Sequence, residues 1–249
     1  MFLEYEFASF IAIIGIVLLA GTVKATFGVG FALISAPLLL MVMDPGDVVA
    51  FIAPLVLLQN LIILRQTWRN VPWKSAAILA VSAATIAPFA VLLQTKLDAN
   101  TLRLAISLAV IGSGVVLLSG LKFNIRREIP AMLVAGATSG ILFPLAGISA
   151  SPVALFLVNQ RWEMATMRAV LAAFLVVLET VTITAFLIGG VVTVESLLLD
   201  ATMLPVVALA VAFSTLVLRH MDSDHYRKSV TFVILASAVL GLVSLILGR

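Results

Sequence analysis

The residues best suited to chemistry are the few polar side chains that interrupt long apolar stretches of this 249-residue chain. Glu179 lies ten residues from either end of one such stretch, 169–189. A carboxylate in so apolar a segment is costly unless it is paired or faces water. Glu179 could therefore carry a proton, pair with a basic residue, or stay neutral and hydrogen-bond to a threonine of a neighbouring helix, and the sequence leaves these roles open.

Two short breaks in the apolar pattern are candidate binding sites. The first is Lys24-Ala-Thr-Phe-Gly-Val-Gly30, and the second is Gly147-Ile-Ser-Ala-Ser-Pro152. A helix that starts after a break presents unpaired amide groups and the positive end of its dipole, which suit an oxyanion. Glycine lets an anion approach the backbone, serine adds a hydroxyl donor, and proline is tolerated at a helix start. The residues predicted to bind the anion here are Lys24, Thr26, Gly28, Gly30, Gly147, Ser149 and Ser151.

Each of these residues also has a structural alternative. Glycine in membrane helices commonly serves close helix packing. Lys24 either completes the anion site or extends to the membrane surface.

Three further polar residues are candidate contacts. Arg168 precedes the apolar helix of Glu179 and could hold an oxyanion with its planar guanidinium, or it is an ordinary charge at the cytoplasmic edge. Gln59 and Asn60 offer amide donors to a central site, or they join neighbouring helices by hydrogen bonds.

Composition defines the elements that must position these residues. The chain is 63% apolar and 11% charged, whereas soluble domains carry about 25% charged residues. At about 20 residues per crossing, the chain has material for roughly ten transmembrane segments. Irregular backbone is tolerated at membrane depth only where it is buried in protein or lines a cavity. We therefore predict an all-α, polytopic transmembrane helix bundle that forms a single domain over 1–249. The ten expected segments are 7–23, 28–43, 48–64, 75–93, 104–121, 129–145, 149–158, 169–189, 197–218 and 230–247.

The two breaks indicate an internal repeat. Gly21 precedes Pro37 by sixteen residues, and Gly136 precedes Pro152 by the same spacing, which gives an offset of 115. We expect repeat one at about 7–121 and repeat two at about 129–247, each opening with a broken or re-entrant helix pair. Since each repeat holds about five segments, an odd number, the two would enter the membrane from opposite sides as inverted repeats.

Basic residues predict the orientation, because Lys and Arg are concentrated in cytoplasmic connections. With the amino terminus outside, eleven basic residues face inward and three face outward, so both termini are expected to be external. The inward set is Arg65, Arg69, Lys74, Lys122, Arg126, Arg127, Arg161, Arg168, Arg219, Arg227 and Lys228; the outward set is Lys96, Arg103 and Arg249. The net charge of +3 is explained by topology, and we expect no nucleic-acid partner.

Other chemistry has little support in the sequence. His220, Asp222, Asp224 and His225 crowd one cytoplasmic connection, but polar loops of this kind are usually only solvated, so no metal site is predicted. The chain has no cysteine, zinc-protease motif, nucleophile elbow or Walker loop. We expect no cofactor and no enzymatic activity.

The two breaks also resemble a known family. Gly28-x-Gly30 leading to Pro37, and Gly147-Ile-Ser149-Ala-Ser151-Pro152 followed by Arg168, are similar to the duplicated signature of the TauE/SafE sulfite exporter family. The resemblance covers nearly the whole chain and implies an inner-membrane protein that moves sulfite, sulfonates or related sulfur oxyanions. The first half departs from the commoner run of three glycines, since Val29 separates two glycines and Phe31 follows.

The sequence therefore predicts a secondary transporter that exports a small sulfur oxyanion by alternating access, with Glu179 as the candidate for proton coupling. Two alternatives remain, an intramembrane enzyme and a membrane scaffold whose breaks serve only packing. The expected partners are the anion and the lipid bilayer, and the sequence does not predict an oligomeric state.

Overall fold

The computed structural model describes residues 7–118, 127–192 and 194–219, and within these ranges every regular element is a helix. The helices are α1 (Phe7–Phe27), α2 (Phe31–Leu39), α3 (Pro45–Thr67), a 3-10 turn (Trp68–Asn70), α4 (Trp73–Gln94), α5 (Ala99–Leu118), α6 (Glu128–Ala146), α7 (Ser151–Asn159), α8 (Met164–Ile188), α9 (Val194–Ala201) and α10 (Leu204–Arg219).

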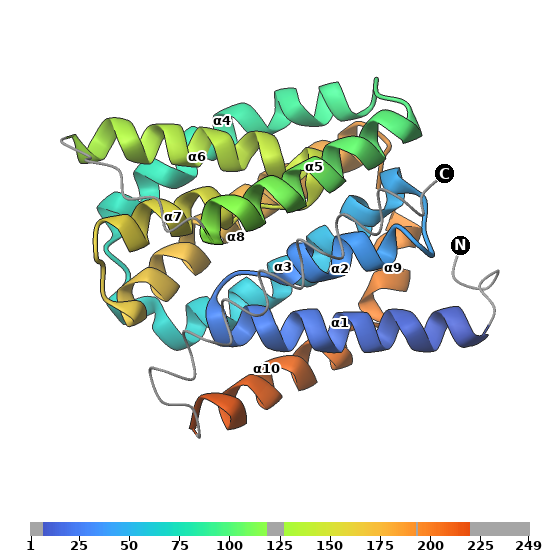
Figure 1. Ribbon diagram of the computed structural model, residues 1–249, viewed down its shortest axis with the longest axis horizontal. Coiled ribbons are helices and arrows are strands. Elements are labelled where there is room, and N and C mark those ends of the chain that lie inside the picture. Colours follow the sequence, from blue (N-terminus) through green and yellow to red (C-terminus); the bar gives the residue numbers. More distant parts are fainter. Residues whose placement is uncertain (1–6, 119–126, 193, 220–249) are drawn as a thin grey trace.

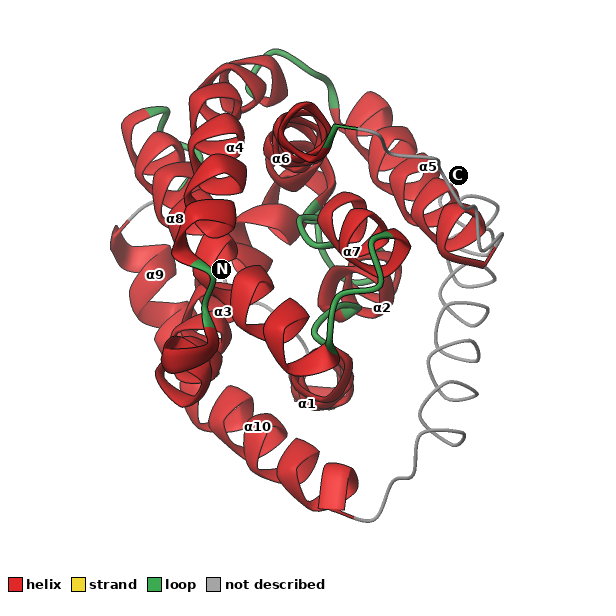
Figure 2. Ribbon diagram, turned by 90° about the vertical axis from the view of Figure 1, so that its left-hand side faces the viewer, coloured by secondary structure: helices red, strands yellow, loops and turns green. Residues whose placement is uncertain are grey.

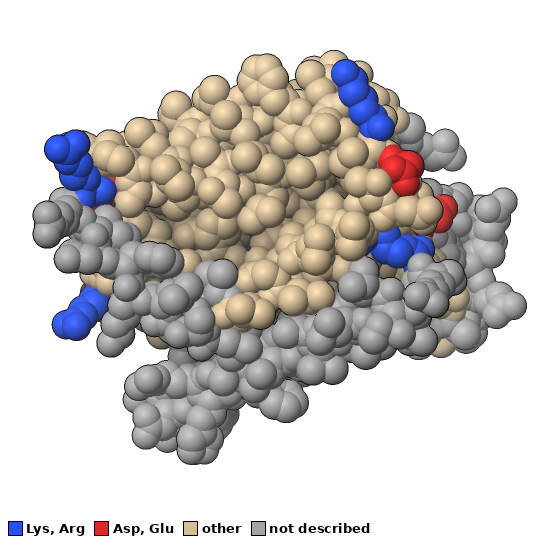
Figure 3. Space-filling view, turned by 45° about the horizontal axis from the view of Figure 1, so that its top comes forward, with Lys and Arg blue, Asp and Glu red and all other residues tan. Residues whose placement is uncertain are grey.

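Several helices are long and apolar enough to cross a membrane. In the described part of the chain there are five such spans: Ser9–Thr26, Pro45–Asn70, Trp73–Gln94, Glu128–Ala146 and Met164–Ile188. Lysine and arginine side chains gather toward the two ends of the face in Figure 3, and a broad uncharged area lies between them. The chain is therefore a multi-pass membrane protein.

Two helical hairpins are formed where long helices break. At the end of α1, Gly28 and Gly30 have positive φ angles of 81° and 111°, and α2 then runs back beside α1 (Figure 1). At the end of α6, Gly147 has a φ of 71°, and α7 runs back beside α6. Glycine adopts these left-handed conformations without the steric cost that a Cβ atom would impose. The glycines at these positions therefore allow the chain to reverse direction at both breaks.

The remaining helices surround these hairpins. The pair α3 and α8 pack against each other, α1 packs on α10, and α4 packs on α6. Seen end-on, α2 and α7 lie between α1, α5 and α6 (Figure 2). Their own side chains are largely buried, so the ends of both short helices are enclosed by protein.

Glycine also permits the closest contacts between the outer helices. A Cβ atom on Gly140 of α6 would lie 2.5 Å from the Ala83 carbonyl oxygen of α4. One on Gly21 of α1 would lie 2.8 Å from the Cβ atom of Ala210 in α10. Both glycines therefore serve helix packing, which is the common role of small residues in membranes.

The structure corrects three details of the sequence interpretation. The first break is shorter than expected, since α1 continues through Lys24 to Phe27. The expected segment 197–218 is two helices, α9 and α10, separated at 202–203. The short helices begin at Phe31 and Ser151, which are 120 residues apart, whereas the glycine and proline spacing gave an offset of 115. The predicted segment 230–247 lies outside the described residues.

The prolines explain the wrong offset. Pro37 is the seventh residue of α2, whereas Pro152 is the second residue of α7. The two prolines share a spacing from Gly21 and Gly136, but they do not occupy the same place in their helices. Gly21 and Gly136 themselves lie inside α1 and α6 rather than in the breaks.

Candidate functional site

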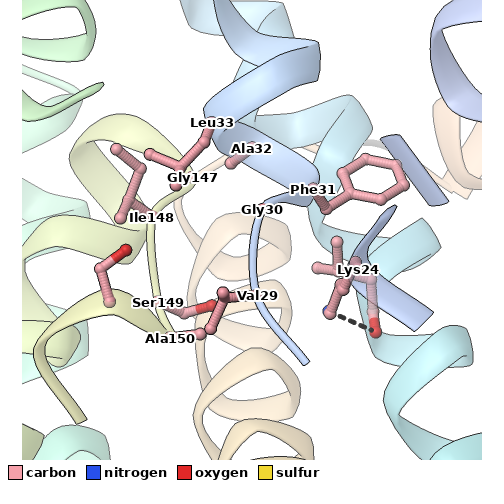
Figure 4. A pocket seen from close by; sticks show the side chains of 12 residues that line it. Lys24, Val29, Gly30, Phe31, Ala32, Leu33, Gly147, Ile148, Ser149 and Ala150 are labelled. Atoms are coloured by element: carbon pink, nitrogen blue, oxygen red, sulfur yellow. Dashed lines mark hydrogen bonds between the residues drawn. The ribbon is translucent and has the colours of Figure 1, made fainter. Parts of the chain in front are cut away.

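A small cavity lies where α2 and α7 begin (Figure 4). Its volume is about 20 Å³, which is room for about one water molecule. The lining residues come from α1, α3 and the two breaks: Lys24, Val29, Gly30, Phe31, Ala32, Leu33, Val56, Gly147, Ile148, Ser149, Ala150 and Ser151. The cavity thus combines backbone from both hairpins with one charged side chain, that of Lys24.

The starts of both short helices carry amide groups without intrahelical acceptors. The first helical bonds run from Ile34 N to Gly30 O in α2 (3.2 Å) and from Ala154 N to Ala150 O in α7 (2.8 Å). The amides that precede these bonds have no partner in their own helix, and neither helix has a side-chain cap. Because the positive ends of both helix dipoles meet at one cavity, the site favours a negative charge.

The second break adds hydroxyl groups to this backbone. Ser149 and Ser151 both line the cavity and are each 7% exposed. Gly147 brings the break close to the other hairpin, since its Cβ position would be 3.4 Å from the Cβ atom of Ala32. Gly30 and Gly147 are therefore the points at which the two breaks can approach each other and a ligand.

Lys24 supplies the positive charge of the cavity. Its side chain is 3% exposed and therefore does not extend to the surface. The ammonium donates to the carbonyl oxygen of Val56 at 3.4 Å and lies 3.8 Å from the carboxylate of Glu179. Both distances are long for charged partners, so the ammonium is held loosely.

Glu179 is not among the residues that line the cavity. It is fully buried in α8, and the Asn60 amide nitrogen donates to both of its oxygens at 2.8 Å. Of the three roles that the sequence left open, the structure shows the pairing with a basic residue. Asn60 is thus a helix–helix contact between α3 and α8 that fixes the carboxylate.

Besides Asn60 and Glu179, four predicted residues are not among those that line the cavity. Thr26 donates to the Thr22 carbonyl oxygen within α1, and Gly28 packs near Leu171. Gln59 donates to the Gly21 carbonyl oxygen at 2.6 Å, which is the helix–helix role weighed from the sequence.

The fourth is Arg168, a half-buried residue of α8. The sequence placed it just before the helix, but α8 begins earlier, at Met164. Arg168 therefore lies on the helix itself, within its second turn.

Several lining residues were missed by the sequence interpretation. Phe31, Ala32, Leu33, Ile148 and Val56 contribute backbone groups and apolar walls, and their side chains give no chemical signal. The signal that could have found the first three is their position, since they follow directly after Gly30 at a helix start. The cluster around His220 lies outside the described residues.

An all-helical, multi-pass membrane protein with a polar cavity at the meeting point of two broken helices has the architecture of a membrane transporter. The chain matches the family model described as "Sulfite exporter TauE/SafE" over residues 13–240, and it belongs to that family. The family is one of transporters, so the chain is a transport protein and not an enzyme. No curated protein and no solved structure matches the chain.

Proposed function

We propose that the protein exports a small sulfur oxyanion, such as sulfite or a sulfonate, across the inner membrane. The observation that carries this proposal is the convergence of two helix starts and Lys24 on one cavity. The family description supplies the substrate class. Backbone amides and a cation bind the oxygens of such an anion without discriminating its central group, so the site suits the whole class.

Within this proposal, the cavity-lining residues have separate tasks. The amides of Gly30 and of the first residues of α2 bind oxygens from one side, and Ser149 and Ser151 donate from the other. Lys24 neutralises the charge. Gly147 keeps the second break free of side-chain bulk, and Asn60 and Gln59 hold α3 in place beside α1 and α8.

The cavity volume implies that the protein moves during transport. Room for about one water is too little for a sulfur atom with three or four oxygens and substituents. The two breaks must therefore separate to admit the anion. A small site between two hairpins that widens when they move is an arrangement suited to alternating access.

Inverted repeats would supply the moving halves. The helix pairs α1–α2 and α6–α7 have the same order, and their short helices are both nine residues long. The packing of α1 on α10 has a counterpart in that of α6 on α4, with a close glycine contact in each. We propose that residues 1–249 form one transmembrane domain in which these hairpins enter the membrane from opposite sides as re-entrant pairs.

Transport of a panel of anions into proteoliposomes tests this function. We expect uptake of sulfite, thiosulfate, taurine or sulfoacetate above that of empty liposomes, with competition between the accepted anions. Chloride in the same assay controls for unspecific anion leak. Uptake that is equal in the presence and absence of the protein for every member of the panel would refute the proposed function.

A further inference from the structure

Lys24 has two neighbours that compete for its charge. It lines the cavity, and its ammonium also lies 3.8 Å from the Glu179 carboxylate. Both side chains are almost fully buried, Lys24 at 3% and Glu179 at 0% exposure. Without an anion, the two charges compensate each other, which is the condition for keeping either one ionised inside protein.

An anion in the cavity changes this balance. The single positive charge of the ammonium then has two negative neighbours, the anion and the Glu179 carboxylate. Water does not reach Glu179 to stabilise the negative charge that remains unneutralised. A buried carboxylate that loses its counter-ion becomes neutral by binding a proton, because the uncompensated charge costs several kcal/mol.

We propose that Lys24 passes from Glu179 to the bound anion, and that Glu179 takes up one proton in the same event. This inference deepens the proposed function and rests on it. The proton comes from the aqueous side from which the anion enters, and no covalent bond other than the new O–H bond of Glu179 is formed. Asn60 stays within reach of the protonated carboxyl, whose unprotonated oxygen still accepts its amide hydrogen.

The charged groups around Glu179 are few, which makes the exchange specific to this pair. Among the described residues, Lys24 of α1 and Asn60 of α3 are the polar side chains that reach it. α7 contains no charged residue, and α4 contains only Lys74, which is exposed at the helix start. The charged residues of α3 and of the 3-10 turn are Asp47, thirteen residues before Asn60, and the exposed Arg65 and Arg69. On α8 itself, Arg168 lies eleven residues earlier, about three turns away.

The proposed exchange determines how much net charge crosses the membrane in each transport cycle. The empty site holds an ammonium and a carboxylate, and the site loaded with a monoanion holds an ammonium, the anion and a neutral carboxyl. Both states have no net charge, so a monoanion moves with one proton and the membrane potential does no work on the cycle. Export then proceeds when the outward gradient of the anion exceeds the inward gradient of protons.

Calorimetry on the purified wild-type protein in detergent tests the inference directly. Thiosulfate and methanesulfonate are the probes, because neither titrates near neutral pH and any proton taken up therefore belongs to the protein. Binding heats measured at pH 8 in buffers of different ionisation enthalpy give the number of protons bound with each anion. We expect about one proton per anion by linkage.

Variants identify the group that binds the proton. Glu179→Gln should bind the anion with proton uptake reduced to about zero, since the amide fills the same space without titrating. The matched control is Glu163→Gln, which alters an exposed acid just before the same helix and should keep the wild-type stoichiometry.

The outcomes separate the inference from the proposed function. Anion binding to the wild type without proton uptake would overturn the exchange and leave the anion site intact. Proton uptake by Glu179→Gln that equals the wild-type value would have the same consequence. If neither probe binds, the proposed function fails and the exchange fails with it. The wild-type measurement decides the question even if Glu179→Gln does not fold.

Discussion

At the scale of single residues, the account depends on one buried cation. Lys24 is the charged residue among those lining the cavity. Its ammonium lies 3.4 Å from the Val56 carbonyl oxygen and 3.8 Å from the Glu179 carboxylate. A cation that is loosely held and already desolvated can turn to an entering anion at little further cost. The other donors at the site are neutral backbone and hydroxyl groups.

Replacing Lys24 with methionine should therefore weaken anion binding strongly. Loss of a charge-assisted hydrogen bond costs about 1.5–3 kcal/mol, which corresponds to a roughly 10- to 150-fold higher dissociation constant. Calorimetry with thiosulfate measures this change. The control is Lys74→Met, which removes an exposed charge at the start of α4 and should bind as the wild type does. Equal affinity in both variants would remove Lys24 from the site.

Lys24, Ser149 and Ser151, which the sequence singled out, line the cavity, but nothing in the sequence indicated their partners. The apolar surroundings of Glu179 and the glycines of both breaks were sufficient to single them out, because polar and flexible residues are costly within membrane segments. The contact between Lys24 and Glu179 joins residues 155 positions apart, and its formation depends on how α1, α3 and α8 pack. The backbone donors of α2 have no sequence signal except their place after Gly30.

At the scale of helices, glycine contacts set the distance between α6 and α4. Besides Gly140, Gly136 lies close to the Leu79 carbonyl oxygen, where an added Cβ atom would be 2.6 Å away. Backbone atoms cannot move aside as a side chain can. The position of α6, and so of the break that follows it, depends on these small residues.

Gly140→Ala should lower the melting temperature, because the added methyl group meets the backbone of α4 at 2.5 Å. Overpacking of this kind costs about 1–3 kcal/mol. Thermal unfolding in detergent, followed by intrinsic fluorescence, measures the shift. Gly112→Ala in α5 is the matched control, since no atom lies within 4 Å of its Cβ position and alanine favours the helix. A Gly140→Ala protein as stable as the control would contradict the tight contact.

A second prediction at this scale concerns α9, which carries the buried Asp200. Burial, and then the negative charge of Asp47, raise the pKa of Asp200 from its ordinary value near 3.8 to about 7. The folded state therefore binds more protons than the unfolded chain between these values, so this residue stabilises the fold at acidic pH. That contribution is lost as the pH rises through about 7.

Melting temperatures measured from about pH 5 to about pH 8 test this sign. We expect Asp200→Asn to flatten the fall in stability across this range. Asp98→Asn should not, because Asp98 is exposed and hydrogen bonds from Thr101 hold its pKa below the ordinary value. An identical pH profile in the wild type and Asp200→Asn would show that Asp200 titrates normally.

At the scale of the whole molecule, the direction of the helices defines two membrane faces. The end of α3 and the start of α6 lie at one end of the bundle, and the connection between α4 and α5 lies at the other (Figure 1). The positive-inside rule assigns the first end to the cytoplasm. We propose this assignment, which would place the start of α1 at the external face.

Labelling of single cysteines tests this orientation without interference, because the chain has no native cysteine. Lys96→Cys, between α4 and α5, should react with an impermeant maleimide in intact cells. Asn70→Cys, between α3 and α4, should react only after permeabilisation. The reverse pattern would invert the topology and the direction assigned to the amino terminus.

The overall architecture was more predictable than its internal symmetry. Composition and apolar run length predicted an all-helical membrane protein, which the structure confirms, because a segment that crosses lipid has little choice but a helix. The repeat offset taken from Gly21 and Pro37 does not match the offset of 120 between the short helices. Gly21 packs against α10 and Pro37 lies inside α2, so neither residue marks the break. A shared spacing of sixteen residues between a glycine and a proline does not distinguish these environments.

Exchange of radiolabelled sulfite in proteoliposomes tests the central claim most directly, since it asks whether one site serves both faces of the membrane. Liposomes containing the protein are loaded with labelled sulfite and diluted into buffer with or without unlabelled sulfite. Alternating access around the Lys24 cavity predicts faster loss of label when unlabelled sulfite is present outside, and no such acceleration with Lys24→Met. Label loss that matches empty liposomes under both conditions would contradict the account.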